Sequence, residues 1–427
     1  MISNIKTISL TGIEGSLVEV QTDITGGLPT FEIVGLPDTS VKESKERIKS
    51  AIKNSNVEFP SRRIIINLAP ASTKKEGTSY DLPIAIGILI AQKEIINNKL
   101  ENTIFIGELS LDGKINRING VLPMCIEAMN LGIRKVILPK ANEREAAVVQ
   151  NLEIIGVQNL QEVIDYLNGN KKIEKAQIDI LKIFNKKSKE KLDFSEVKGQ
   201  ENVKRALEIA AAGGHNCILI GPPGSGKTMI AKRIPTILPD LTFEESLDVT
   251  KIHSISGILD NNIGIVTTRP FRSPHHTISP TSMIGGGRNP KPGEISLAHN
   301  GVLFLDELPE FNRTTLEILR GPLEDKEVTI SRLYSKVEYP SNFMLIASMN
   351  PCPCGYYGSE EKTCNCSKIA IEKYLNKISG PLLDRIDLHV ELKPVKYQKL
   401  NSDIKPIILK TDEDENLIQL LLPIKTY

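Results

Sequence analysis

The chain contains 427 residues, of which 40% are hydrophobic and 25% charged, and its formal net charge is +1. This length predicts two or three domains, and the composition is that of a soluble globular protein. The balanced charge excludes a uniformly basic nucleic-acid-binding protein, so any DNA contact must be a local patch. The chain has six cysteines, no leader-like start and no apolar run of bilayer length, which favours a cytoplasmic protein without a membrane segment.

The first 170 residues alternate short strand patterns with helical ones. Alternating or β-branched runs predict strands at residues 16–21, 31–34, 63–68, 103–106 and 135–138. The apolar stretch 82–93 is a helix or another buried segment, and helical spacing predicts helices at residues 40–55, 141–150 and 160–167. Asp38 or Ser40 can cap the first helix. This pattern is typical of an α+β domain.

Part of this domain resembles Lon-type proteases, on the evidence of residues 69–83, 107–113 and 132–139. The resemblance implies a Lon-protease-like domain over residues 1–170, with the catalytic serine at Ser79. The catalytic lysine of that family falls on or near Leu122, which has no amine, and Lys114 lies too far along the segment to replace it. Because a serine without a general base is a poor nucleophile near neutral pH, we expect the fold without protease chemistry. Ser79 is then an ordinary loop or helix-cap residue.

Lysines crowd residues 171–192, which we interpret as a solvated linker or exposed helix, with DNA contact as the alternative. A second domain begins at residue 193. Its first helix is predicted over residues 201–212 and ends at Gly213 and Gly214, a natural C-cap.

An apolar strand at residues 217–220 runs into a glycine-rich loop and a short helix at 229–233, which is the order of a P-loop. The glycines let backbone N–H groups converge on phosphate oxygens, and the helix start adds its positive end. Lys227 is expected to reach the β- and γ-phosphates of ATP, and the Thr228 hydroxyl to hold Mg²⁺. The predicted ATP-binding loop consists of Gly221, Pro222, Pro223, Gly224, Ser225, Gly226, Lys227 and Thr228.

Polar side chains follow two further apolar strands, at residues 301–305 and 343–348. Asp306 is expected to hold the Mg²⁺ shell, and Glu307 to orient or deprotonate the attacking water. An amide at Asn350 can hydrogen-bond both that water and the γ-phosphate. Together with the P-loop, these residues predict ATP hydrolysis.

The motif series resembles that of AAA+ ATPases with a P-loop α/β domain. Residues 382–385 complete this series. A closer resemblance, to the magnesium chelatase-like branch and, with the Lon-like front, to the YifB/ComM family, is carried by residues 269–279 and 293–301. It extends from residue 1 to about 392. The function that it implies is ATP-driven movement on DNA, as a helicase or branch-migration factor in recombination or natural transformation. The alternatives are a chelatase-type ATPase that remodels a protein partner, a Lon-like ATP-dependent peptidase, and a truncated nucleotide-binding protein without turnover.

Arg385 has two interpretations. On sequence alone, a local ion pair with Asp384 or Asp387 is the simpler one. The resemblance instead implies an arginine finger offered to a neighbour's γ-phosphate, which requires a homo-oligomeric ring, expected to be a hexamer. It also implies an AAA+ domain over residues 193–392 and a sensor role for Asn350.

Two insertions are expected to grip single-stranded or branched DNA, as insertions do in the branch that includes the replicative MCM helicases. They are residues 269–300 and a hairpin with strands at 327–330 and 336–339. The candidate phosphate contacts are Arg272, Arg288, Arg332 and Lys336. His275 and His276 are interpreted as hydrogen-bonded loop residues and not as metal ligands.

Two close thiol pairs, Cys352 with Cys354 and Cys364 with Cys366, suit a tetrahedral Zn²⁺ site. The spacing is tighter than the usual Cys-x₂-Cys, and free or redox-active thiols are the alternative. Cys125 lies in an apolar setting and is predicted to be a core residue, as is Cys217.

Residues 393–427 depart from the family pattern. They are acidic at 411–415 and contain no arginine, and residues 417–424 are a short helix or strand. The family usually continues into a helical lid with a second sensing arginine, so we expect that lid to be missing or replaced.

Overall fold

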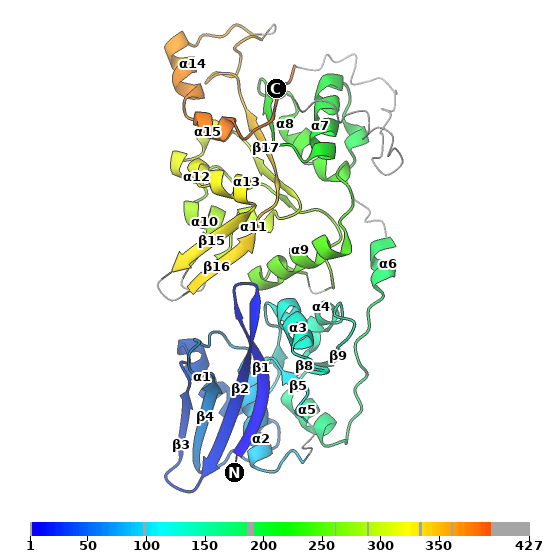
Figure 1. Ribbon diagram of the computed structural model, residues 1–427, viewed down its shortest axis with the longest axis vertical. Coiled ribbons are helices and arrows are strands. Elements are labelled where there is room, and N and C mark those ends of the chain that lie inside the picture. Colours follow the sequence, from blue (N-terminus) through cyan, green and yellow to red (C-terminus); the bar gives the residue numbers. More distant parts are fainter. Residues whose placement is uncertain are drawn as a thin grey trace. The chain divides into compact units, whose positions relative to one another are not determined.

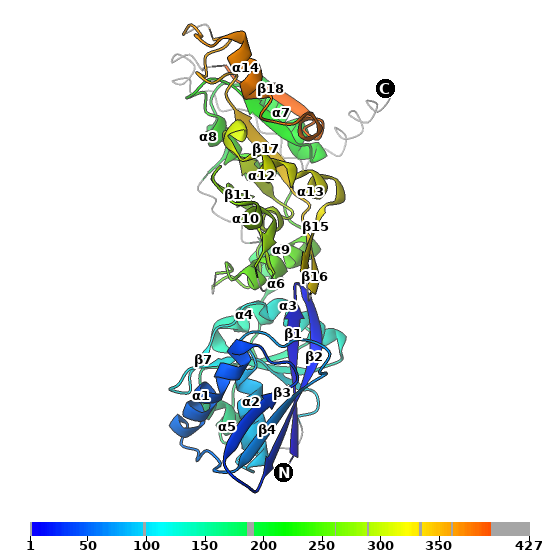
Figure 2. The ribbon, with the colours of Figure 1, turned by 90° about the vertical axis from the view of Figure 1, so that its left-hand side faces the viewer.

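The computed structural model describes residues 2–96, 100–185, 192–260, 262–287, 290–332, 335–359 and 362–393. It contains two compact units, each of which can be followed in Figures 1 and 2. The first comprises Met1–Phe184 and His253–Ile265, and the second comprises Asn185–Ile252 with the described residues from Val266 onward.

Some predictions fall outside the described ranges: those for Arg288, for the lysines within 186–191, and for the tail from residue 394, including the element at 417–424. No helix among the described residues is long and apolar enough to cross a membrane.

A seven-stranded mixed sheet forms the centre of the first unit, in the order β3-β4-β2-β1-β5-β8-β9 (Figure 1). Its strands are β1 (Ile2–Thr11), β2 (Glu14–Thr25), β3 (Thr30–Val34), β4 (Arg63–Ala69), β5 (Thr103–Phe105), β8 (Lys135–Pro139) and β9 (Glu153–Val157). Strand β2 pairs antiparallel with β1 and β4, and the other neighbours are parallel. The predicted strands are confirmed, whereas β1 and β9 were not expected.

The helices of this unit are α1 (Thr39–Asn54), α2 (Asp81–Ala91), α3 (Val121–Asn130), α4 (Glu143–Ala146), α5 (Leu160–Leu167) and α6 (Ile180–Asn185). Asp38 caps α1 by accepting a hydrogen bond from the N–H of Val41 at 2.8 Å. The apolar stretch at 82–93 is the buried helix α2. The helix predicted at 141–150 is wrong in its second half, because α4 ends at Ala146 and a turn follows, in which the N–H of Val149 donates to the Ala146 carbonyl at 3.1 Å. Val148 and Val149 are β-branched, which disfavours a helix slightly.

Residues 253–265 belong to the first unit although they come late in the chain. The carbonyl of Ser254 accepts a hydrogen bond from the N–H of Gly120 at 3.2 Å. The Ser254 hydroxyl donates to the buried carboxylate of Glu145. These bonds satisfy groups that burial removes from water. The sequence-based domain division at 171–192 did not anticipate this segment.

Five parallel strands form the sheet of the second unit, in the order β11-β14-β17-β10-β18. They are β10 (Cys217–Ile220), β11 (Phe271–Arg272), β14 (Val302–Leu305), β17 (Met344–Met349) and β18 (Leu388–Glu391). The chain leaves β10 for the far edge at β11, returns through β14 and β17, and ends beyond β10 at β18. This is the order of a doubly wound α/β sheet, in which ligands bind at the carboxyl ends of the strands.

The remaining main elements of this unit are α7 (Glu201–Gly213), α8 (Lys227–Ala231), α9 (Phe243–Ser256), α10 (Pro280–Ile284), α11 (Glu294–Leu297), α12 (Arg313–Glu317), α13 (Arg320–Asp325), β15 (Glu327–Arg332), β16 (Ser335–Pro340), α14 (Lys368–Leu375) and α15 (Gly380–Leu383). Helix α7 ends at the predicted C-cap, with Gly214 at φ 63°. Its Leu207 belongs to one buried apolar cluster with the strand residues Cys217, Leu219 and Phe304.

Candidate functional site

Three neighbouring strands bring the predicted nucleotide-binding residues to one edge of the second sheet. The P-loop follows β10, Asp306 and Glu307 follow β14, and Asn350 follows β17. The N–H of Gly221 donates to the carbonyl of Met349 at 3.2 Å, which ties the start of the P-loop to the end of β17. The parallel sheet therefore assembles residues that are more than a hundred positions apart.

The Lys227 ammonium lies inside the P-loop and contacts oxygens from two segments. Its Nζ donates to the carbonyls of Gly221 at 2.7 Å and Pro222 at 3.0 Å, and to Oδ1 of Asn350 at 3.1 Å. A cation held by exchangeable neutral oxygens is prepared to bind phosphate oxygens more strongly, because those carry charge. The loop thus fits the triphosphate of ATP.

Two further features fit the binding of ATP by this loop: the backbone conformation of Gly226 and the charges around Lys227. Gly226, immediately before α8, has φ 88°, a left-handed conformation that glycine adopts without strain. Burial lowers the pKa of Lys227, and the carboxylates of Asp306 and Glu307 oppose this shift. The site therefore combines a half-buried cation with a nearby acidic pair, as a magnesium-nucleotide site requires.

Asp306 is held by hydroxyl groups on both carboxylate oxygens. The Thr228 hydroxyl donates to Oδ2 at 2.7 Å, and the Ser348 hydroxyl donates to Oδ1. Hydroxyl and carboxylate oxygens are hard ligands of the kind that Mg²⁺ prefers, so this pair fits the expected ion. Ser348 was missed in the sequence, where the only signal was a polar residue within the apolar strand.

Glu307 adopts a left-handed backbone conformation, φ 55°, which is uncommon for a non-glycine residue. Its N–H donates to the Ser348 hydroxyl at 3.3 Å, while its side chain is 58% exposed. Nδ1 of His276 lies 3.9 Å from Oε2 of Glu307. The sequence indicated only a loop role for His276, so its position beside the proposed water-activating carboxylate is new. His275 fits the loop interpretation, with Nδ1 2.9 Å from the hydroxyl of Thr277.

Arg385 pairs with a distant carboxylate and not with a neighbouring one. Its Nη2 contacts Glu324 of α13, and its Nη1 donates to the Pro381 carbonyl at 2.5 Å. Its Nε–H is buried and has no partner among the described residues. Asp387, a partner suggested by the sequence, instead accepts a hydrogen bond from the N–H of Asn216 at 3.0 Å. None of the contacts described for Arg385 reaches the P-loop of its own chain.

The predicted hairpin is confirmed as β15 and β16, which pair antiparallel from Glu327 with Pro340 to Arg332 with Ser335. Its apolar side chains, such as Val337, are buried. Lys336 is exposed, and its Nζ lies 2.6 Å from Oε1 of Glu338 on the same strand. The solvent side of the hairpin therefore carries a cation that is already paired with a carboxylate.

Arg272, a predicted phosphate contact, forms an ion pair with Glu294. Its Nε and Nη2 donate to the two carboxylate oxygens of Glu294 at 2.6 and 2.7 Å. This bidentate pair ties β11 to the start of α11, and a phosphate contact by Arg272 stays a prediction.

Four thiols form a compact cluster. Sγ of Cys352 lies 3.3 Å from that of Cys354 and 3.7 Å from that of Cys364, and Cys354 and Cys364 are 3.6 Å apart. With Cys366, all four Sγ atoms lie within 4.8 Å of one another. Ligands placed about 2.3 Å from a tetrahedral zinc ion would be roughly 3.8 Å apart, whereas a disulfide is about 2.05 Å long. The cluster therefore has the dimensions of a metal site.

The other two cysteines, Cys125 and Cys217, are fully buried, as predicted for core residues. Burial raises the pKa of the Cys217 thiol to about 12. Neither thiol is therefore a reactive group at neutral pH.

In the first unit, Ser79 is nearly buried just before α2, and its carbonyl accepts a hydrogen bond from the N–H of Gly107 at 3.1 Å. No amine among the described residues bonds its hydroxyl. Leu122 is fully buried, and Lys114 is exposed and paired with Asp112 at 3.0 Å. The buried Lys75 donates instead to backbone carbonyls in its own loop.

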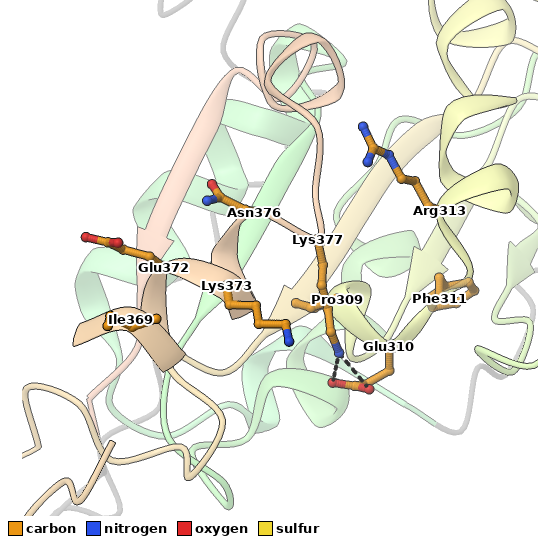
Figure 3. A pocket seen from close by; sticks show the side chains of 9 residues that line it. All are labelled: Pro309, Glu310, Phe311, Arg313, Ile369, Glu372, Lys373, Asn376 and Lys377. Atoms are coloured by element: carbon orange, nitrogen blue, oxygen red, sulfur yellow. Dashed lines mark hydrogen bonds and ion pairs between the residues drawn. The ribbon is translucent and has the colours of Figure 1, made fainter. Parts of the chain in front are cut away.

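A separate pocket of about 670 Å³ lies between the segment after Glu307 and helix α14 (Figure 3). Lys377 donates to both carboxylate oxygens of Glu310 at 3.2 Å on one side of it. Phe311 and Ile369 contribute apolar surface. None of its lining residues belongs to the P-loop, so we do not assign nucleotide to it.

Sequence comparison relates both units of the chain to known protein families. The family described as "Magnesium chelatase, subunit ChlI" matches residues 193–400, and "Subunit ChlI of Mg-chelatase" matches residues 20–142. The chain is similar to uncharacterized protein YifB of Escherichia coli, with 45% identity over 392 residues, 92% of this chain and 76% of the relative. It is also similar to competence protein ComM of Haemophilus influenzae, with 44% identity over 386 residues, 89% and 74% of the two chains. A more distant similarity, 28% over 184 residues, links it to Lon protease 2 of Bacillus subtilis and covers 39% and 33% of the two chains.

The first prediction separates nucleotide binding from hydrolysis. Lys227→Ala should weaken ATP binding, because it removes the cation inside the loop. Glu307→Gln should preserve binding but slow hydrolysis by roughly 10²–10⁴-fold, the usual contribution of a general base. Nucleotide titration and phosphate release measure the two effects. Glu310→Gln, which neutralises a nearby carboxylate on the pocket, is the matched control and should keep the parent rate. Hydrolysis at the parent rate by Glu307→Gln would disprove its role.

The second prediction concerns Ser79. We expect no ATP-dependent cleavage of unfolded casein, because none of the amines in the described part of the chain is placed to activate the serine hydroxyl. Gel analysis of casein incubated with the chain and ATP measures this directly. Cleavage that Ser79→Ala abolishes, and that the exposed control Ser72→Ala leaves intact, would overturn the prediction.

Proposed function

The chain belongs to the YifB/ComM family of magnesium chelatase-like AAA+ ATPases, and we propose that it is a ring-forming motor that hydrolyses ATP to move on DNA. We infer a cytoplasmic helicase or branch-migration factor that acts on single-stranded or branched DNA in recombination or natural transformation. The observation that carries the proposal is the convergence of the P-loop, the Asp306 strand and the Asn350 strand at one sheet edge.

The residues of that edge divide the work of hydrolysis. Lys227 would exchange its three neutral oxygens for phosphate oxygens, which leaves the amide of Asn350 free to bind the γ-phosphate and the attacking water. Thr228 and Asp306 would hold Mg²⁺, which neutralises charge on the β- and γ-phosphates. Glu307, with its exposed carboxylate, would orient or deprotonate the water.

Two observations support DNA as the partner. The Haemophilus influenzae relative is named a competence protein, and competence is the capacity of a cell to take up DNA. The hairpin presents Lys336 on its exposed side, and Arg332 ends β15. Cations that contact phosphates hold a strand without reading its sequence, which suits a motor that must pass over any sequence.

We assign Arg385 to the nucleotide site of a neighbouring subunit. Its contacts in one chain do not reach the P-loop, and its Nε–H has no partner in the described part of the chain. A finger that acts in trans needs a next subunit at every interface, and a closed ring supplies one. We propose a homohexamer.

We also assign the thiol cluster to one structural zinc ion, bound by Cys352, Cys354, Cys364 and Cys366. Four cysteine ligands close the coordination shell, which is the arrangement of structural and not catalytic zinc. The N–H groups of Tyr357 and Cys366 donate to Sγ atoms at 3.3 and 3.4 Å, and such bonds stabilise thiolates.

A chelatase-type ATPase that remodels a protein partner is the second candidate, because both matching families are described as magnesium chelatase subunits. The nucleotide site would be the same, and only the partner would differ. Hydrolysis stimulated by a protein or porphyrin partner, and not by DNA, would favour it. A parent protein that binds ATP without turnover would instead favour a nucleotide-binding role.

The third prediction tests the DNA partner. Single-stranded or forked DNA should raise the rate of ATP hydrolysis. Arg332→Ala combined with Lys336→Ala should lose most of this stimulation but keep the basal rate. The slope of log affinity against log salt should become shallower by about 0.7 for each lost single-strand phosphate contact.

The control for this prediction is Lys49→Ala, which removes an exposed lysine of α1 and should leave stimulation unchanged. Failure of both DNA forms to stimulate the parent protein would contradict DNA as the partner. Stimulation that survives the double substitution would contradict only the role of the hairpin.

The fourth prediction tests Arg385 as a finger. Arg385→Ala should bind ATP but hydrolyse it about 10³–10⁵-fold more slowly, as in other P-loop enzymes that use a trans arginine. Mixing it with Glu307→Gln subunits should restore some activity, because intact interfaces reappear. Steady-state ATPase assays of the separate and mixed proteins measure both effects.

Glu324→Gln is the control here, since it breaks the ion pair of Arg385 but leaves the arginine. A purely structural ion pair predicts that both substitutions lower the melting temperature slightly and neither blocks hydrolysis, because an exposed pair contributes about 1 kcal/mol or less. That outcome would exclude the finger.

A further inference from the structure

The four-cysteine loop begins beside the sensor residue of the nucleotide site. Asn350, whose Oδ1 accepts a hydrogen bond from Lys227, is followed by Pro351 and then by Cys352. Cys352 is fully buried, whereas the other three cysteines are partly exposed. The first thiol of the cluster is therefore fixed close to the end of β17.

The same loop packs on the P-loop through Gly355. A Cβ at this position would lie 2.6 Å from Cδ and 2.8 Å from Cγ of Pro223, and 3.9 Å from Cγ of Asn350. Carbon atoms that are not bonded attract best at about 3.5–4.0 Å, so the backbone of Gly355 already touches the proline. No larger residue fits without moving the P-loop or the thiol loop.

The chain that follows the last cysteine of the thiol loop forms helix α14. Ser367 follows the last cysteine and caps α14 by accepting a hydrogen bond from the N–H of Ala370 at 3.2 Å. Helix α14 carries Tyr374, whose hydroxyl pKa is raised by burial and lowered, to a smaller extent, by the backbone of Asn350. One end of the thiol loop therefore follows Asn350 directly, its middle contacts Pro223, and the helix after its other end carries a tyrosine near Asn350.

We propose that zinc bound by the four cysteines braces the nucleotide site, by holding Pro223 of the P-loop and Asn350 of the sensor strand in one arrangement. The inference rests on the proposed nucleotide and zinc sites, and it adds that the nucleotide site depends on bound zinc. A metal that cross-links a short loop supplies most of the free energy that orders it. The apolar cluster that holds the sheet together contains no residue of the loop, so loss of zinc should disorganise the nucleotide site and leave the unit folded.

Gly355 and Gly358 provide a matched pair for the test. Both have left-handed backbones, with φ 86° and 75°, but a Cβ at Gly358 would have nothing within 4 Å. Gly355→Ala and Gly358→Ala therefore impose similar backbone strain, and only the first pushes on Pro223. Because a misplacement of about 1 Å can cost roughly 100-fold in rate, we expect Gly355→Ala to lower ATPase activity by roughly 10–100-fold. Gly358→Ala should remain close to the parent, and both should retain zinc.

Removal of the metal tests whether the nucleotide site depends on zinc. The full-length chain, purified without added zinc, should contain about one zinc ion by elemental analysis. Chelation, or Cys364→Ser with Cys366→Ser, should lower nucleotide affinity and ATPase activity as Gly355→Ala does, while circular dichroism stays unchanged. Added zinc should restore the chelated parent and not the cysteine variant.

The outcomes separate the brace from the assignments on which it rests. A folded, active parent without zinc would overturn the zinc site and the brace. A zinc-loaded parent that binds no nucleotide would overturn the proposed function and the brace with it. If zinc is present, but chelation and Gly355→Ala both leave ATP affinity and turnover at parent values, the brace alone is wrong.

Discussion

The cation at Lys227 sets the main constraint on the second unit. A charge that is partly removed from water must be compensated by oxygens, and here these come from its own loop and from Asn350 on another strand. The compensation works only if β10 and β17 are neighbours in register. A second bond, from Ser348 to Asp306, joins β17 to β14 in the same way. These polar bonds at the edge of the sheet can form only in the observed strand order, and the apolar interior stabilises the same order.

Much of this site could be predicted from the sequence because its signals are local. A strand that ends in glycines, lysine and threonine specifies its chemistry within one short segment, and so do the acidic and amide ends of β14 and β17. The partners that complete the site are set by tertiary structure. Ser348 becomes important only because β17 lies beside β14, and Glu324 reaches Arg385 only because α13 lies near α15. No pattern of spacing contains that information.

The features that the sequence did not indicate have similar causes. The helix predicted at 141–150 is only α4, which ends at Ala146, before the buried β-branched residues Val148 and Val149. Arg272 was predicted to be a phosphate contact, and the structure adds that its Nε and Nη2 donate to Glu294. His276 was interpreted as a loop residue, and the structure adds that its Nδ1 lies 3.9 Å from Oε2 of Glu307. In each case, a residue's role depends on a neighbour that is distant in sequence.

Residues 253–265 affect how the chain acquires its structure during synthesis. The first unit lacks this segment until residue 265 has left the ribosome, long after β10 and the P-loop have emerged. Until then, the carboxylate of Glu145 keeps its bonds from the N–H of Leu122 and the amide of Asn142 but lacks the one from Ser254. The N–H of Gly120 lacks the Ser254 carbonyl as its acceptor, and a lost hydrogen bond is destabilising. In the usual order of folding, an N-terminal domain is finished before the next one starts. Here the first unit is completed by residues 253–265, which come after the P-loop in the chain, so its last contacts form only after part of the ATPase sequence has been made.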